Sequence, residues 1–193
     1  MKRILAVIAA LLVAVAIFAQ DEVGTYFIKP MAGMNVSNYV GSDANSKCRV
    51  GFTGGVEVGY QMSPNIAVSG GVLFSMQGAK SDKTDTDVTV HANYLNMPIL
   101  LNYYIFKGMA IKAGVQPGIN VSATATTELP GRSIDQDVQG YYTFDLSIPV
   151  GLSYEWRHMV LDARYNIGLT NVKEDMSARN SVFQLTLGYK FRM

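Results

Sequence analysis

Strict alternation between apolar and polar or small residues is the feature of this sequence that most limits its fold. In the C-terminal segment, one face carries Phe183, Leu185, Leu187, Tyr189 and Phe191, and the other carries Gln184, Thr186, Gly188, Lys190 and Arg192. Successive side chains of a β-strand point to opposite faces, so this period of two predicts a strand with one apolar and one polar face. The 11 Tyr, 8 Phe, 1 Trp and 18 Gly are poor helix formers and argue against a helical bundle.

The same alternation recurs in eight segments. We predict strands at 25–39, 51–62, 66–78, 88–105, 109–122, 141–156, 159–170 and 181–192. Long polar links alternate with short turns: the long ones are 40–50, 79–87, 123–140 and 171–180, and the short ones are 63–65, 106–108 and 157–158. Long loops at one end and short turns at the other are typical of outer-membrane barrels. The predicted fold is therefore an all-β, eight-stranded, antiparallel up-and-down transmembrane β-barrel.

The first twenty residues have the pattern of an export signal. Met1-Lys2-Arg3 is followed by an apolar run from Ile4 to Phe18 and then by Ala19-Gln20-Asp21. A run of 15 apolar residues is short for a transmembrane helix, which needs about 20. We predict a signal peptide at 1–19, with a cut after Ala16 as the alternative, and a barrel domain at 20–193.

Two features predict that the apolar faces point outward into lipid. The polar faces carry many small residues, which suit the crowded interior of an eight-stranded barrel; these are Gly33, Gly55, Gly59, Gly71, Gly114, Gly118, Gly151, Gly168 and Gly188. Aromatic residues fall near both ends of the apolar faces, as in the girdles of membrane barrels; these are Phe52, Tyr60, Phe144, Tyr154, Trp156, Phe183, Tyr189 and Phe191. The alternative is a soluble, lipocalin-like barrel with its apolar faces inside, which would bind a ligand there.

An outward apolar face places nine charged residues in the lumen. They are Lys29, Glu57, Lys112, Asp145, Glu155, Asp162, Arg164, Lys190 and Arg192. Because the interior of such a barrel is only wide enough for side chains, we expect these charges to pair and to fill it. A network that closes the barrel is the main interpretation, and a narrow proton or solute path is the alternative.

Other functional classes have weaker signals. A formal net charge of +1 gives no footprint for nucleic acid. His91 with Ser75 or Ser122 near the outer rim would suit a lipid hydrolase, but no spacing joins them, and we place His158 in a solvated turn. Asp82, Asp85 and Asp87 lack the pattern of a calcium loop. Cys48 is expected as an unpaired thiol in the first outer loop. We expect no enzyme activity, cofactor or metal.

Three segments resemble the PorT-like outer-membrane β-barrel family. They are Tyr94-Leu95-Asn96-Met97-Pro98-Ile99-Leu100-Leu101-Asn102-Tyr103-Tyr104, Gly151-Leu152-Ser153-Tyr154-Glu155 and Asp162-Ala163-Arg164-Tyr165-Asn166-Ile167-Gly168-Leu169-Thr170-Asn171. The resemblance covers essentially the whole mature chain and implies an eight-stranded barrel in the outer membrane of a Gram-negative bacterium. For the founding member it also implies a part in type IX secretion.

These patterns together predict a small monomeric outer-membrane barrel with a filled lumen. We expect a structural or interaction role through its extracellular loops, since the wall itself is fixed by hydrogen bonding and lipid contact. The expected partners are outer-membrane lipid, the barrel-assembly machinery and an extracellular or periplasmic protein. A narrow transport or type IX secretion-associated barrel is the alternative function.

Overall fold

The fold consists of β-strands joined by short links. The computed structural model describes residues 22–41, 46–81, 87–129, 132–137, 142–173 and 176–193. The strands are β1 (Tyr26–Val40), β2 (Ser46–Ser63), β3 (Ile66–Ser81), β4 (Asp87–Asn96), β5 (Ile99–Phe106), β6 (Met109–Leu129), β7 (Arg132–Asp137), β8 (Phe144–Trp156), β9 (Met159–Lys173), β10 (Met176–Tyr189) and β11 (Phe191–Arg192). Across these ranges, no helix has the length and hydropathy to span a bilayer. The predicted signal peptide lies outside the described residues and stays a prediction.

The strands close into a barrel with eight wall positions. Each strand pairs antiparallel with its neighbours, and β1 closes the ring on β10 from Met31–Gly188 to Val40–Arg179. β4 and β5 share one wall position between β3 and β6. They are separated at Met97-Pro98, where proline has no N–H to donate to the ladder. The predicted eight-stranded up-and-down barrel is confirmed, with its fourth strand divided in two.

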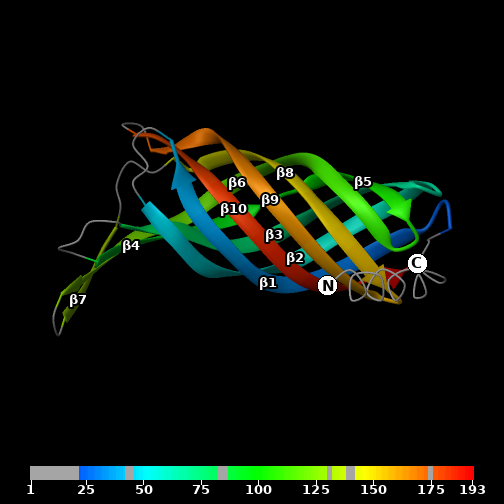
Figure 1. The fold of residues 1–193 in the computed structure, drawn as a ribbon, viewed down its shortest axis with the longest axis horizontal. Helices are drawn as coiled ribbons and strands as arrows, with labels where there is room; N and C mark the ends of the chain where they lie inside the picture. The colour runs from blue at the N-terminus through cyan, green and yellow to red at the C-terminus, as the bar shows by residue number, and fades with distance from the viewer. Residues whose placement is uncertain (1–21, 42–45, 82–86, 130–131, 138–141, 174–175) are drawn as a thin grey trace, which may run out of the picture.

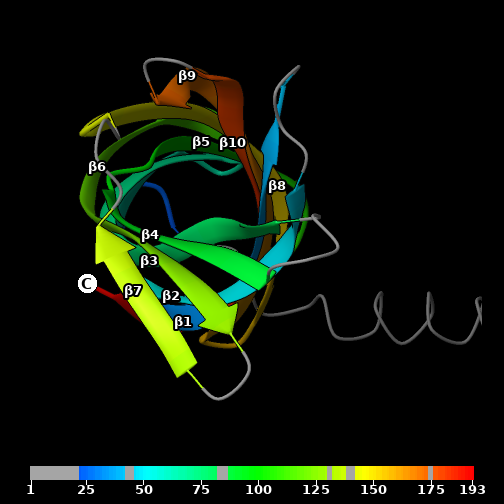
Figure 2. The same cartoon turned by 90° about the vertical axis from the view of Figure 1, so that its left-hand side faces the viewer.

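The two faces of the wall have opposite chemistry. Inward positions are mostly polar, and Thr53, Glu57 and Gln61 on β2 are fully buried. Outward positions on the same strand are apolar, and Val56 and Val58 are 44% and 52% exposed. Figure 2, a view along the barrel from one end, shows the strands closing into a ring around this interior. The lipocalin-like alternative is therefore wrong, because its lumen would be apolar and its outside polar.

The three predicted short turns are confirmed and lie at one end of the barrel, here named the turn end. They are the two-residue links 64–65, 107–108 and 157–158. Gly108 and Arg157 have positive φ angles of 84° and 58°, a conformation that such tight links use. The C-terminus lies at the same end (Figure 1), where Met193 exchanges backbone hydrogen bonds with Tyr26. The opposite end is named the loop end.

At the loop end the strands run further than predicted. β2 begins at Ser46, inside the predicted link 40–50, and the fourth link, predicted as 171–180, is mostly strand because β9 ends at Lys173 and β10 begins at Met176. The third link, predicted as 123–140, contains the end of β6 and the whole of β7. The alternation signal ends where no apolar face is required, but backbone pairing needs no apolar face and therefore continues.

Candidate functional site

Five charged side chains meet in the middle of the lumen and form what we name the central cluster: Lys29, Glu57, Lys112, Asp162 and Arg164. They come from four strands, and sequence register brings them together. Lys29 lies opposite Glu57 on the neighbouring strand. Gly151 lies between Lys112 and Arg164 in adjacent strands, and a Cβ there would lie 3.0 Å from the Arg164 Cγ atom. The missing side chain at Gly151 leaves space in which the arginine turns inward.

The ion pairs of the central cluster are close and almost fully shielded from solvent. Lys29 Nζ lies 2.7 Å from Glu57 Oε2 and 3.6 Å from Asp162 Oδ2. Arg164 Nε lies 2.6 Å from Asp162 Oδ1, and Arg164 also pairs with Glu57. Lys112 pairs with Asp162. Each side chain is at most 5% exposed. Removing one partner from such a cluster would leave a buried uncompensated charge, so the pairs depend on one another.

A second group of charges, the turn-end cluster, consists of Glu155, Lys190 and Arg192. Lys190 Nζ lies 2.9 Å from Glu155 Oε2, donates to the Tyr104 hydroxyl over 3.3 Å, and lies 4.5 Å from the Phe27 ring centroid. Arg192 pairs with Glu155 and donates to the Arg157 carbonyl oxygen. Arg192, which follows the last aromatic residue Phe191, therefore ties the C-terminal strand to the β8–β9 turn.

The nine predicted lumen residues thus fall into three groups. Five form the central cluster and three the turn-end cluster, in which Arg192 is 25% exposed. The ninth, Asp145, is buried near the loop end and accepts hydrogen bonds from Thr170 and Asn180, each over 3.1 Å, without a salt bridge among the described residues. Asp145 is therefore separate from the other eight charges, because it is at the opposite end of β8 from Glu155.

One buried charge was not predicted. Arg49 is 7% exposed, donates to the Gln77 carbonyl oxygen over 2.7 Å, and lies 2.7 Å from His91 Nδ1. The sequence analysis places Arg49 in the predicted link 40–50. It lies on β2, however, in the same alternation as Thr53 and Glu57, so extending that pattern by two steps would have found it.

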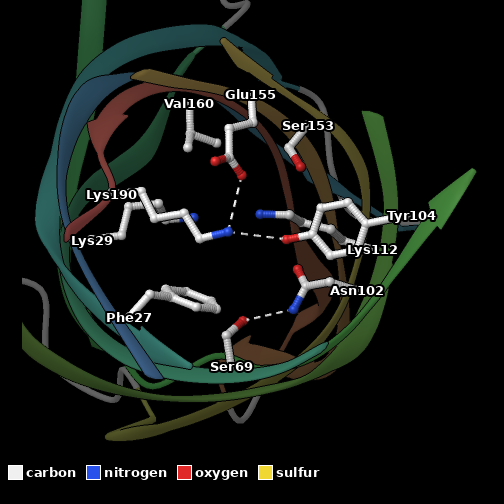
Figure 3. Close-up of a pocket in the computed structure, with 10 residues that line it drawn as sticks. All are labelled: Phe27, Lys29, Ser69, Asn102, Tyr104, Lys112, Ser153, Glu155, Val160 and Lys190. Carbon is white, nitrogen blue, oxygen red and sulfur yellow. Dashed lines mark hydrogen bonds and ion pairs between the residues drawn. The ribbon is translucent and has the colours of Figure 1, made fainter. Parts of the chain in front are cut away.

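The side chains of the central and turn-end clusters lie in the lumen. The lumen cavity that the structure shows has a volume of about 10 Å³, which is room for about one water molecule. Figure 3 shows Lys29, Lys112 and Lys190 reaching into it from different parts of the wall.

The predicted girdle aromatics lie on the outer face. Seven of the eight are 37–54% exposed, and Tyr154 is half-buried. Phe144 begins β8 and Trp156 ends it, so these two lie at opposite ends of one strand. Tyr189 stacks on His158, an exposed residue of the β8–β9 turn as predicted, with ring centroids 5.4 Å apart.

At the loop end, β4, β6 and β7 form a three-stranded sheet. The stretch Thr124–Glu128 of β6 pairs with β4 on one side and with β7 on the other. Figures 1 and 2 show β7 projecting beyond the ring of the barrel. Among the described strands, β7 pairs only with β6 and therefore lies at the edge of this sheet.

The structure describes the weaker candidate sites in part. Ser75 accepts hydrogen bonds from Asn35 and Gln77, and Ser122 accepts one from Asn93. The ring of His91 lies against Arg49. Asp82 and Asp85 lie outside the described residues, and no group of three metal-ligating side chains occurs in the part of the chain that is described. Cys48 is an exposed free thiol, but it lies on β2 and not in a loop, because β2 begins earlier than predicted.

Comparison with known proteins identifies the fold family. A family model described as outer membrane protein beta-barrel domain matches residues 18–174. Among solved structures, the attachment invasion locus protein Ail of Yersinia pestis is 18% identical, with a TM-score of 0.54, over 88% of this chain and all of Ail. Neisserial surface protein A is 16% identical, with a TM-score of 0.53, over 87% of this chain and 99% of its own.

Ail has also been solved in complex with the heparin analogue sucrose octasulfate, and that structure has a TM-score of 0.54. A search of curated proteins finds no significant match. At these identities the solved structures show likeness of fold, whereas the family model covers most of the sequence. The family-model match agrees with the closed barrel and its apolar outer face. The chain therefore belongs to the outer membrane protein beta-barrel domain family and lies in the outer membrane of a Gram-negative cell.

Proposed function

We propose that this protein is a non-enzymatic, monomeric barrel that carries a strand-built extension above the outer membrane for contact with an extracellular partner. The observation that carries the proposal is the β4–β6–β7 sheet at the loop end. A sheet held by backbone hydrogen bonds presents its edge in one orientation, which a partner can recognise. The filled lumen argues that the barrel serves as a support and not as a channel.

The lengths of the strands support a position of the β4–β6–β7 sheet above the membrane. A tilted strand crosses the hydrocarbon core in about 9–11 residues. Phe52 to Tyr60 and Phe183 to Phe191 each span nine residues on the outer face, as two girdles one membrane apart would require. β2 has 18 residues and β6 has 21, so both strands are long enough to continue beyond the outer girdle.

The structural neighbours support a surface role by analogy. Ail is named for attachment and invasion, and its complex contains a heparin analogue. Exposed aromatics on the last strands, Tyr189 and Phe191, support recognition by the barrel-assembly machinery.

The experiment shortens the extension without touching the barrel. Ala125 and Gln136 pair directly, so replacing Thr126–Asp135 by Asn-Gly would close a two-residue hairpin there. Cells displaying the wild type should adhere to immobilised extracellular-matrix proteins or heparin, and cells displaying the shortened form should not. Both forms should keep the same heat-modifiable gel migration, which controls for folding. Equal adhesion by both forms, or no adhesion above that of empty cells, would refute the proposal.

The PorT-like resemblance supplies the alternative of a narrow transport or secretion-associated barrel, and conductance separates it from the first. A barrel closed by the central cluster should give no stable current in a planar bilayer. Reproducible single-channel steps that change when Lys112 is replaced would favour the transport alternative.

A further inference from the structure

Gly70 on β3 occupies a position on the lipid-facing side of the wall. The preceding residue, Ser69, is buried on the lumen side, so Gly70 belongs to the outward set of this strand. Register places Gly70 in an outward row with Ile28 on β1, Val58 on β2 and Ile99 on β5. Val58 and Ile99 are 52% and 54% exposed. The row is therefore apolar, with a gap at the glycine.

This gap is open, whereas another outward glycine is covered. A Cβ atom at Gly70 would have its nearest contact among the described residues 3.7 Å away, at the Pro98 carbonyl oxygen. On β2, a Cβ atom at Gly54 would lie 3.0 Å from the Phe52 ring. The protein therefore covers the outward glycine of β2 with its own aromatic side chain and leaves the glycine of β3 uncovered.

The gap belongs to a larger apolar groove, here named the wall groove. It has a volume of about 740 Å³ and extends from the row of Gly70 toward the turn end, where Tyr26, Tyr60 and Val68 line it. None of the described lining residues has a charged side chain. Sites for small organic ligands have volumes of about 300–1,000 Å³ and are mostly apolar. The size and lining of the wall groove therefore suit a hydrocarbon ligand.

The wall groove lies beside aromatic residues at the turn end. Tyr26 and Tyr60 pair across β1 and β2, with ring centroids 4.7 Å apart, and are 59% and 37% exposed. Val58 and Gly70 lie one outward step further from the turn end. Tyrosines in such girdles sit at the level of the lipid head groups. The gap at Gly70 therefore faces acyl chains, and the tyrosine hydroxyls face ester and phosphate oxygens.

We propose that the wall groove binds one glycerophospholipid, with an acyl chain over Gly70 and the head group beside Tyr26 and Tyr60. The groove is continuous with the lipid-facing wall, so lipid is the molecule that reaches it in the membrane. A flexible chain can follow a hollow one side chain deep, and it gains dispersion contacts from several sides there. A second barrel would present a stiff wall of paired strands to the same hollow.

Photolabelling in a bilayer tests the site. The wild-type barrel is refolded in vesicles of dioleoylphosphatidylcholine that contain a trace of phosphatidylcholine with a diazirine on one acyl chain, and the label is mapped by mass spectrometry. Val58 and Ile99 should carry several-fold more label than Leu152 and Leu161, which are 47% and 48% exposed on β8 and β9 outside the groove. Equal labelling of the two pairs would overturn the proposal.

Filling the groove supplies the matched variants. Gly70→Leu has room for its Cβ atom and should keep the heat-modifiable gel migration of the wild type, but the excess label should be lost. Ala113→Leu enlarges an exposed residue of β6 outside the groove and should keep the excess. A folded Gly70→Leu protein that keeps the excess would refute the site.

Native mass spectrometry of protein extracted from the same vesicles distinguishes a lipid from a second copy of the chain. We expect a monomer that retains one phospholipid, and a Gly70→Leu monomer that retains none. A wild-type dimer that Gly70→Leu dissociates would show that the wall groove binds another barrel, and would overturn the proposal.

Discussion

Asp162 has more ionic partners than any other acid of the central cluster, so Asp162→Asn is the sharpest test of that cluster. The carboxylate contacts Lys29, Lys112 and Arg164 and is 1% exposed. The amide would leave three cations with Glu57 as their only acid, and breaking a buried ion pair costs roughly 3–5 kcal/mol. The equilibrium constant for unfolding should rise by about 10²–10⁴-fold. Urea unfolding in lipid vesicles, followed by the fluorescence of Trp156, measures this change.

Two further variants separate charge from shape. Asp162→Asn combined with Lys112→Met restores the original excess of one positive charge in the cluster, so the double variant should recover most of the lost stability. Glu22→Gln removes an exposed acid and should stay within about 0.5 kcal/mol of the wild type. If Asp162→Asn is also within about 1 kcal/mol, or if the double variant is no more stable than the single one, the cluster is not the interdependent unit described above.

Three more predictions concern the wall and its orientation. Arg192→Ala removes the ion pair with Glu155 and the hydrogen bonds to the Arg157 carbonyl, and should cost about 1–2 kcal/mol in urea unfolding, whereas Met193→Ala should have little effect. Gly59→Ala should lower the free energy of unfolding by about 1–3 kcal/mol, because its Cβ would lie 2.1 Å from the Phe27 ring. Gly70→Ala, whose Cβ would have its nearest contact at 3.7 Å, should be almost neutral. Equal losses in the two variants would contradict this packing. We propose that the loop end faces outward, so Cys48 should react with a membrane-impermeant maleimide on intact cells. Cys48→Ser/Lys107→Cys should react only after the outer membrane is opened, and the opposite pattern would invert the orientation.

The predicted lumen residues show how far alternation alone can go. A period of two assigns each residue to one of two faces, and Lys29, Glu57 and Arg164 were placed on the inner face from this rule. It does not give the height of a residue along the barrel. That height depends on the shear between strands, which sets which side chains meet across the lumen. For this reason Asp145 was grouped with charges from which it is separate.

Strand ends were less predictable than strand centres. Inside the membrane, lipid requires an apolar outer face, and the requirement leaves a clear pattern in the sequence. Beyond the girdles both faces can be polar, so the ends of β6 and β10 and the whole of β7 leave no such pattern. The extension that carries the proposed function therefore lies where the sequence signal is weakest.

The sequence by itself determined the fold class, the number of wall positions, the face that meets lipid and the three short turns, because each follows from local period, composition or turn chemistry. Only the tertiary structure decided which charges pair and that β7 continues the sheet at the loop end. These properties depend on register and shear between strands that are far apart in the chain, and a local pattern does not contain them.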